Sequence, residues 1–212
     1  MADYTFFTVP MSRGQIARWA LHEAGAEYEH VLVDWADRPV ELAAANPMNK
    51  VPTLIHHAPE GDRVITECAG ICAYLADIHV EADLFPREEE KADYYRWMFF
   101  AAGPLEQAVI SRAMGWNVPE GKTGMAGFGT YELTIEVMDG LLSSRDWVCG
   151  PRFTMADVYV GSQIDWGLNF GSIPPLPSFA AYAERIRTRA GYQSAKAIDR
   201  ELIKAAKGRT GG

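Results

Sequence analysis

The sequence is poor in cysteine and has no long apolar run. Its 212 residues include only three cysteines, Cys68, Cys72 and Cys149. A small, odd number of cysteines argues against a disulfide framework and fits a reducing compartment. No run of about 18 apolar residues occurs in the sequence, so we expect no membrane-spanning helix and no membrane partner.

Basic residues are scarce as well. Lysine and arginine number 20 against 28 aspartates and glutamates, which gives a net charge of -8. Proteins that bind nucleic acid usually carry a basic face, so this balance argues against a nucleic-acid partner. The start of the sequence, Met1 to Tyr4, shows no basic region followed by an apolar stretch. We therefore expect no signal peptide and a cytoplasmic location.

Hydrophobic residues make up 48% of the sequence, which is enough for a full core. In residues 1–80 their spacing alternates between values typical of strands and of helices. The predicted strands are 4–8, 28–33, 51–55 and 63–65, and the predicted helices are 12–25, 38–46 and a third that starts near residue 67. A strand–helix–strand unit implies a parallel pair of strands and a short turn implies an antiparallel pair, so we predict an α+β domain.

Strand signals become rare after an acidic segment at 81–88, which we interpret as a linker. A long helix follows, with an apolar stripe formed by Tyr94, Trp97, Met98, Ala101, Leu105 and Val109. A loop rich in glycine at 115–129 separates it from further predicted helices at 130–143, 155–170, 178–190 and 192–206. The predicted organisation is an α+β domain at 1–80 and an all-α domain at 89–212.

One helix start has a specific signature. The order Thr154, Met155, Ala156, Asp157 matches a capping box, in which the first and last side chains bind each other's backbone amides. This pattern predicts a buried helix start that stabilises the second domain.

The first candidate for chemistry is the segment from Asn46 to Leu54, which contains Val51-Pro52 before a strand. If that peptide bond is cis, Val51 could turn its amide and carbonyl outward to pair with an extended peptide. The alternative is a plain turn, since only about 5–6% of such bonds are cis in folded proteins.

The second candidate is Glu67-Cys68 at a helix start. Free amides and the helix dipole suit a carboxylate ligand, and Glu67 suits an ammonium, so together they could hold an amino-acid zwitterion. The alternative is an acidic residue that stabilises the helix by its position alone.

The third candidate is Ser12-Arg13 at the first strand-to-helix turn. Ser12 is either a helix cap or a hydroxyl that donates to a bound thiolate. Arg13 either adds positive charge or is simply solvated. The five histidines fall in no recognisable partner motif, so we predict no catalytic triad.

Taken in order, these segments resemble the cytosolic glutathione transferase family, and among its members the bacterial, serine-type ones. The resemblance covers nearly the whole chain. It is carried by Pro10-Met11-Ser12-Arg13, Leu21 to Gly25, Asn46 to Leu54, Glu67-Cys68, Ala73-Tyr74-Leu75, Arg96 to Leu105 and Phe153 to Asp157. It implies a thioredoxin-like, glutathione-binding domain at 1–80 followed by an all-α domain, with glutathione as co-substrate and no metal.

The resemblance also implies roles for individual residues. Glu67 binds the α-ammonium of glutathione, and the amide of Cys68 binds its α-carboxylate. Val51 pairs with the cysteinyl backbone beside a cis-Pro52. Lys50 and Asn49 face the glycyl carboxylate.

The chain departs from the family's pattern in two places. Most relatives have serine where this chain has Cys68, so we expect glutathione binding weaker by about 1 kcal/mol, the worth of one hydrogen bond. The tyrosine-using classes carry tyrosine where this chain has Thr8 and Val9. No cysteine lies at the first helix either, so Ser12 is the remaining candidate for the donor to the thiolate, with Arg13 beside it.

The resemblance further implies an electrophile site between the domains, for which Met11, Phe99, Gly103 and Trp116 are candidates. The alternative for these residues is plain core packing. The family is typically homodimeric. The expected activity is conjugation of glutathione to a hydrophobic electrophile; the alternatives are peroxide reduction or isomerisation with glutathione, and a non-enzymatic binding or assembly module with the same fold.

Overall fold

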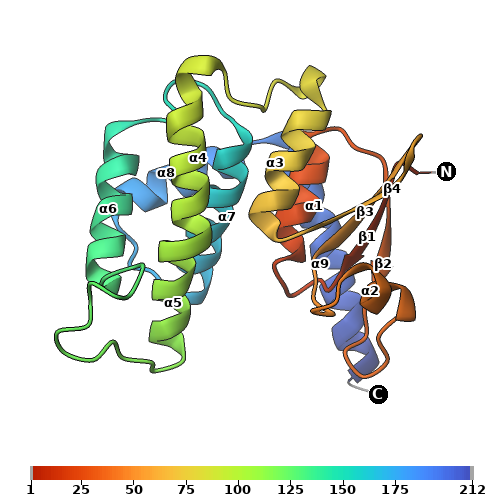
Figure 1. The fold of residues 1–212 in the computed structure, drawn as a ribbon, viewed down its shortest axis with the longest axis horizontal. Coiled ribbons are helices and arrows are strands. Elements are labelled where there is room, and N and C mark those ends of the chain that lie inside the picture. The colour runs from red at the N-terminus through yellow and green to blue at the C-terminus, as the bar shows by residue number, and fades with distance from the viewer. Residues whose placement is uncertain (1, 211–212) are drawn as a thin grey trace. The chain divides into compact units, whose positions relative to one another are not determined.

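The computed structural model describes residues 2–210, which form two compact units (Figure 1). One unit combines residues up to Leu84 with the segment from Thr188 onward, and the other runs from Phe85 to Arg187. The predicted domains, 1–80 and 89–212 with a linker at 81–88, stay a prediction. By contacts, the segment after Thr188 groups with the first unit rather than with the helices that precede it.

The first unit contains a mixed four-stranded sheet with the order β2-β1-β3-β4. Its strands are β1 (Tyr4–Thr8), β2 (Tyr28–Leu32), β3 (Thr53–Ala58) and β4 (Gly61–Thr66). β1 pairs in parallel with β2 and antiparallel with β3, and β3 pairs antiparallel with β4. These pairings confirm the predicted α+β class and give the unit its thioredoxin-like topology.

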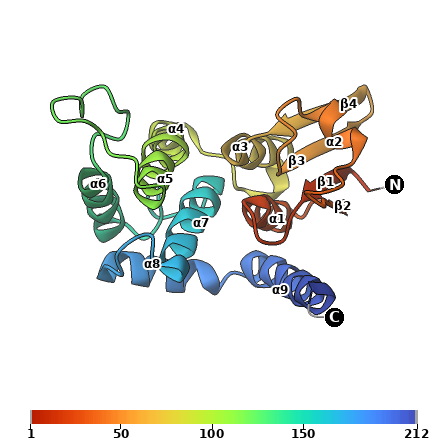
Figure 2. The same cartoon turned by 90° about the horizontal axis from the view of Figure 1, so that it is seen from below.

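Helices cover both faces of this sheet (Figure 2). α1 (Gly14–Glu23) and α3 (Cys68–Ile78) lie on one face, where the guanidinium of Arg18 stands 5.3 Å from the centre of the buried Phe6 ring. The short α2 (Val40–Ala45) covers the other face, where its Leu42 packs in a buried cluster with Phe7. Neighbouring residues of a strand point to opposite faces, which is why Phe6 and Phe7 serve different layers.

The regular elements of the second unit are helices in the described residues. The first unit ends this part of its chain in a short 3-10 turn, η1 (Val80–Ala82). In the second unit the turn η2 (Glu88–Glu90) leads into one long helix made of α4 (Lys91–Phe100), the π-helical segment η3 (Ala101–Leu105) and α5 (Glu106–Ala113). The predicted apolar stripe is buried at Tyr94, Trp97, Met98, Ala101 and Leu105. The unit continues with α6 (Tyr131–Ser144), α7 (Met155–Phe170) and α8 (Pro177–Arg187).

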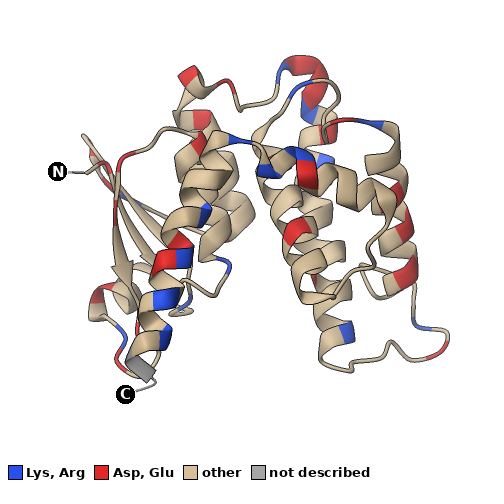
Figure 3. Ribbon diagram, turned by 180° about the vertical axis from the view of Figure 1, so that it is seen from behind, with Lys and Arg blue, Asp and Glu red and all other residues tan. Residues whose placement is uncertain are grey.

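The last helix, α9 (Ala190–Thr210), lies alongside α1 in both views (Figures 1 and 2). Basic and acidic side chains both occur along it (Figure 3). The sequence predicted that this segment is helical, but it did not predict that α9 packs on the first unit.

The start of α7 has the predicted capping box. The Asp157 carboxylate is fully buried and accepts the backbone amide of Thr154 at 2.8 Å and that of Val148 at 2.7 Å. The hydroxyl of Tyr182 in α8 donates to the same carboxylate at 2.8 Å. One side chain therefore joins the start of α7, the preceding loop and α8.

We expect Asp157→Ala to lower the free energy of unfolding by about 3 kcal/mol, because it leaves several buried donors without an acceptor. Chemical denaturation measures this loss. Asp77→Ala removes an exposed carboxylate and is the control. A loss at position 157 no larger than in the control would contradict the role given to Asp157.

The same carboxylate should make stability depend on pH. Burial raises the pKa of Asp157 to about 6, against the combined effect of its hydrogen-bond donors. The folded state then holds the proton more tightly than the unfolded chain, whose aspartates have a pKa near ~3.9. The contribution of this group is largest below about pH 4, falls between about pH 4 and 6, and is constant above.

Asp157→Asn cannot ionise and serves as the reference. We expect the unfolding free energy of the wild type, minus that of Asp157→Asn, to fall by about 2–3 kcal/mol across that pH interval. A difference that rises with pH would mean that the donors outweigh burial.

Candidate functional site

Three loops meet at one end of the sheet. β1 ends at Thr8, β3 begins at Thr53 and β4 ends at Thr66, and the register pairs Phe7 with Thr53 and Thr53 with Thr66. The loop after β1, the loop before β3 and the turn after β4 therefore lie next to one another. We call this region the loop end, defined as residues 9–13, 46–52 and 67–68. It brings together all the predicted glutathione-binding residues.

The loop after β1 carries Ser12, whose hydroxyl has two partners. Its oxygen accepts the backbone amide of Gly14 at 3.0 Å, and its hydrogen is donated to the carbonyl of Val9 at 2.6 Å. The N-cap position of α1 is Arg13, which makes no side-chain cap hydrogen bond, so Ser12 is not the N-cap residue that the sequence predicted, although it does bind the first amide of the helix. The contact with Val9 occupies the one hydrogen that the hydroxyl can give, so donation to a ligand requires Ser12 to exchange the Val9 carbonyl for that ligand.

A buried hydroxyl lies directly against this loop. Thr8 is fully buried, and its Oγ1 has no hydrogen-bond partner among the residues that the structure describes. A Cβ added to Gly14 would stand only 2.0 Å from that oxygen. Position 14 therefore has to be glycine for α1 to begin this close to the end of β1.

The loop before β3 contains a cis peptide bond between Val51 and Pro52. Asn46 holds this loop from inside, because its Nδ2 donates to the Lys50 carbonyl at 3.2 Å and to the Thr53 hydroxyl at 3.0 Å. Val51 precedes the paired part of β3, so its backbone amide and carbonyl stand outside the sheet ladder. The plain-turn alternative is thus wrong, and Val51 has the backbone setting that pairing with an extended peptide needs.

Positive and polar groups flank the same loop. The Lys50 side chain is exposed, and Asn49 has a φ of 51° and a buried side-chain oxygen without a hydrogen-bond partner in the described residues. Arg38 donates to the Asn49 carbonyl at 3.1 Å and stacks 4.9 Å from the ring centre of Trp35. Sequence reasoning missed Arg38, since no local pattern reveals a contact that crosses from one loop to another.

The turn after β4 places Glu67 immediately before α3. Glu67 has a φ of 60° and a ψ of 123°, a conformation that costs a non-glycine residue roughly 1–3 kcal/mol. Its side chain is exposed and makes no capping hydrogen bond. Glu67 therefore does not stabilise the helix through a capping hydrogen bond. Its carboxylate is available to a ligand at the helix start.

Cys68 connects this turn to the loop after β1. It is only 6% exposed, and its thiol donates to the carbonyl of Arg13 at 3.6 Å. The Arg13 side chain is exposed. Cys72, one helical turn beyond Cys68, is fully buried, and burial raises the pKa of its thiol, as expected for a packing residue.

The candidates for the electrophile site are exposed rather than packed. Met11, Phe99 and Trp116 are 52%, 68% and 62% exposed, so the core-packing interpretation is wrong for these three. Gly103 lies in the π-helical segment η3. Met11 belongs to the first unit and the others to the second, and their joint role stays a prediction.

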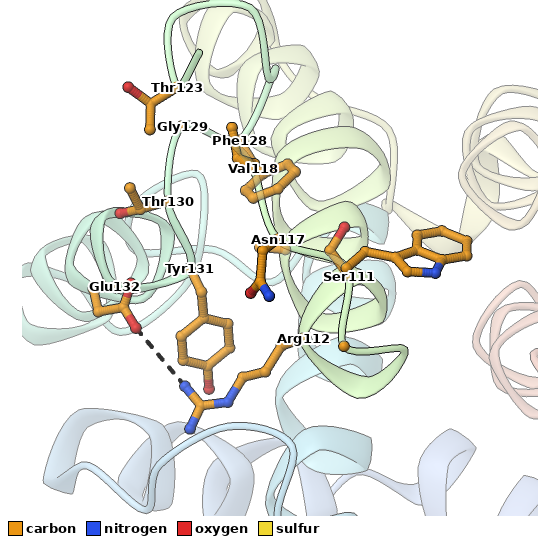
Figure 4. Close-up of a pocket in the computed structure, with 13 residues that line it drawn as sticks. Ser111, Arg112, Asn117, Val118, Thr123, Phe128, Gly129, Thr130, Tyr131 and Glu132 are labelled. Carbon is orange, nitrogen blue, oxygen red and sulfur yellow. Dashed lines mark ion pairs between the residues drawn. The ribbon is translucent and has the colours of Figure 1, made fainter. Parts of the chain in front are cut away.

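The second unit has a cavity of about 450 Å³ between α5 and α6 (Figure 4). On its wall the Arg112 guanidinium lies 4.2 Å from the ring centre of Tyr131 and 3.9 Å from the Glu132 carboxylate. No histidine, cysteine or lysine is among the described residues that line it, and its carboxylate, Glu132, is exposed and paired with Arg112. The loop end remains the better candidate for chemistry.

Within residues 2–210, no cluster of histidine, cysteine and carboxylate side chains is suited to hold a metal ion. In the same range, no helix combines the length and apolar character needed to cross a membrane.

The sequence and the fold of this chain are similar to those of known proteins. Residues 2–77 match the family described as "Glutathione S-transferase, N-terminal domain". Glutathione S-transferase 2 of Schizosaccharomyces pombe is 29% identical over 165 residues, which cover 73% of this chain and 69% of that protein. The disulfide-bond oxidoreductase YfcG of Escherichia coli is 25% identical over 203 residues, which cover 89% of this chain and 91% of that protein.

The fold is also that of a solved sphingomonad glutathione S-transferase complexed with glutathione. The two chains superpose with a TM-score of 0.72 and 24% identity over 92% of this chain and 98% of that one. Residues 2–77 therefore belong to the glutathione S-transferase N-terminal domain family, and the chain as a whole is similar to glutathione transferases in sequence and in fold.

Proposed function

We propose that this protein is a glutathione transferase that binds glutathione at the loop end and transfers its thiol to a small hydrophobic electrophile. The observation that carries the proposal is the sheet register, which gathers the loops of Ser12, Val51 and Glu67 at one end of the sheet. Glutathione has a thiol, a peptide backbone and an amino-acid zwitterion. In the proposal, the loop of Ser12 binds the thiol, the loop of Val51 binds the peptide backbone and the turn of Glu67 binds the zwitterion.

The peptide and its charges have the following partners in the proposed complex. The backbone of Val51 pairs with the cysteinyl residue, and Lys50 and Asn49 face the glycyl carboxylate. Glu67 binds the α-ammonium, and the backbone amide of Cys68 at the start of α3 binds the α-carboxylate. Opposite charges thus meet at both ends of the ligand.

The thiol needs a donor that favours its ionised form. A free thiol with a pKa near ~8.5 is about 3% ionised at pH 7, and a pKa near ~7 makes it about half ionised. Ser12 can supply part of this shift by turning its hydrogen from the Val9 carbonyl to the sulfur while it still accepts the Gly14 amide. Arg13 adds positive charge to the same loop. The thiolate then forms the new carbon–sulfur bond, and the leaving group of the electrophile departs with the electron pair.

A disulfide reductase is a second candidate, favoured by the similarity to YfcG. The glutathione thiolate would attack one sulfur of a disulfide and expel the other as a thiolate. A second glutathione thiolate would then attack the glutathione sulfur of the mixed disulfide, which forms oxidised glutathione and expels the remaining substrate sulfur as a thiolate. Both reactions use the same bound thiolate, so glutathione binding alone does not separate them. They differ in the second substrate, and assays with chlorodinitrobenzene and with a small disulfide therefore distinguish them. The homodimer typical of the family is part of the proposal.

Retention on immobilised glutathione tests the binding step. We expect Glu67→Ala to weaken glutathione binding about tenfold or more, because a hydrogen bond to a charged group contributes about 1.5–3 kcal/mol. Glu29→Ala, an exposed carboxylate on β2, is the matched control. We expect Ser12→Ala to retain binding but lose conjugation of chlorodinitrobenzene, and Ser12→Thr to restore it. A wild-type chain that neither stays on the column nor shifts its melting temperature with glutathione would refute the proposal.

Cys68→Ser tests the weakened contact at the helix start. A serine hydroxyl donates a stronger hydrogen bond than a thiol, so we expect glutathione to bind about fivefold more tightly, the equivalent of about 1 kcal/mol. Isothermal titration calorimetry measures the change. Unchanged affinity in a folded variant would mean that only the backbone amide at position 68 contacts the ligand.

A further inference from the structure

The contact between α1 and α9 follows one polar stripe of α1. Its residues recur at the spacing of a single helical face, and each meets a residue of α9 or the residue just before it. Gln15 meets Lys196, Arg18 meets Asp199, Trp19 meets Tyr192, His22 meets Ser194 and Glu23 meets Arg189. The partners shift from Lys196 and Asp199 near the start of α1 to Arg189 near its end, so the two helices run in opposite directions.

A buried ion pair fixes the middle of this contact. Arg18 and Asp199 are 0% and 2% exposed, and the Arg18 Nε donates to the Asp199 carboxylate at 2.8 Å. The Arg18 Nη1 also donates to the Tyr28 hydroxyl at 2.9 Å. Buried charges that lose their partner are strongly unfavourable, so α9 cannot slide along α1 without a large loss.

The far end of the contact is equally restricted. Arg189 binds the Glu23 carboxylate through two nitrogen atoms, at 2.8 and 2.6 Å. A Cβ on Gly191 would stand 2.7 Å from the side chain of Glu23, so the backbone of α9 lies directly against that side chain. With both places fixed, α9 is a rigid support for α1.

The near end of the contact reaches the loop end. The ammonium of Lys196 donates to the side-chain oxygen of Gln15 at 2.6 Å, and the Gln15 amide nitrogen donates to the Pro10 carbonyl at 2.6 Å. Gln15 is 8% exposed, so these bonds are shielded from water. A charged donor strengthens the chain of hydrogen bonds that follows it. The positive charge on α9 is thus linked through one amide to the loop that carries Ser12.

In the structure, Ser12 binds the Val9 carbonyl and Gln15 binds the Pro10 carbonyl. When Ser12 turns its hydrogen to the sulfur, as proposed above, Gln15 still holds the Pro10 carbonyl. An unsatisfied carbonyl dipole near a sulfur would disfavour the thiolate, whereas a carbonyl bonded to an amide backed by an ammonium leaves the loop less negative. Whatever holds the Pro10 carbonyl also fixes the backbone from which Ser12 projects.

We propose that Gln15 and Lys196 are positioning residues through which α9 sets the ionisation of glutathione bound at Ser12. The proposal rests on the function proposed above. Neither side chain touches the reacting atoms: Gln15 fixes the loop and Lys196 polarises Gln15. The alternative is that the two residues only attach α9 to α1.

The test measures the pKa of the bound thiol, from the ultraviolet absorbance of the thiolate and from the pH profile of kcat/KM with chlorodinitrobenzene. We expect Gln15→Leu to raise this pKa by about one unit, which lowers kcat/KM about five- to tenfold near pH 6.5 and hardly at pH 9. The affinity for glutathione should change less than about threefold, since the predicted ligand contacts remain.

Three further variants isolate the route. Lys196→Met should shift the pKa in the same direction as Gln15→Leu, and Lys196→Arg, which keeps a charged donor, should restore the wild-type profile. The double variant Gln15→Leu/Lys196→Met should match Gln15→Leu, because Lys196 acts through Gln15. Lys204→Met, an exposed lysine on the same helix, is the matched control.

Each outcome decides between the two roles. Melting temperatures that fall while the pKa of the bound thiol stays at the wild-type value would mean attachment only, and would overturn this proposal alone. A wild-type protein that does not bind glutathione would overturn it together with the proposed function. Lys196→Met changes a half-buried side chain, so it keeps the test decisive if Gln15→Leu fails to fold.

Discussion

Backbone pairing of β1 with β3 and of β3 with β4 is the constraint on which the site depends. Because the side chains of a strand alternate, a shift of one residue would exchange its two faces. The register is held by Phe6 on one face and Phe7 on the other, both buried in different layers. The same register puts Thr53 between Phe7 and Thr66, so the packing of the core also decides which loops become neighbours.

Local patterns predicted much of this molecule. The capping box at Thr154 is a contact over three residues, and the strand at Tyr4 to Thr8 is recognised by its own composition. The loop-end residues were found because each belongs to a short motif whose order resembles a known family. Where the determining contacts are close in sequence, the sequence is sufficient.

Contacts between distant segments were not predicted. The sequence predicts a helix at 192–206, yet the partner of α9 is α1, almost the full length of the chain away. Arg18 read from the sequence is one more charge on a helix, and only the fold reveals that Asp199 is buried against it. The Val9 carbonyl as partner of the Ser12 hydroxyl was also hidden, because a backbone acceptor has no sequence signature.

The position of α9 has a consequence for how the protein is made. A ribosome adds about 5–20 residues per second, so α1 is synthesised roughly ten to thirty seconds before α9. During that interval the stripe of α1 from Gln15 to Glu23 is bare, and Arg18 has no Asp199 to neutralise it. The sheet and the whole helical unit emerge before the first unit can close. The first unit is therefore incomplete until α9 is made, and during that interval it is most exposed to chaperones and proteases.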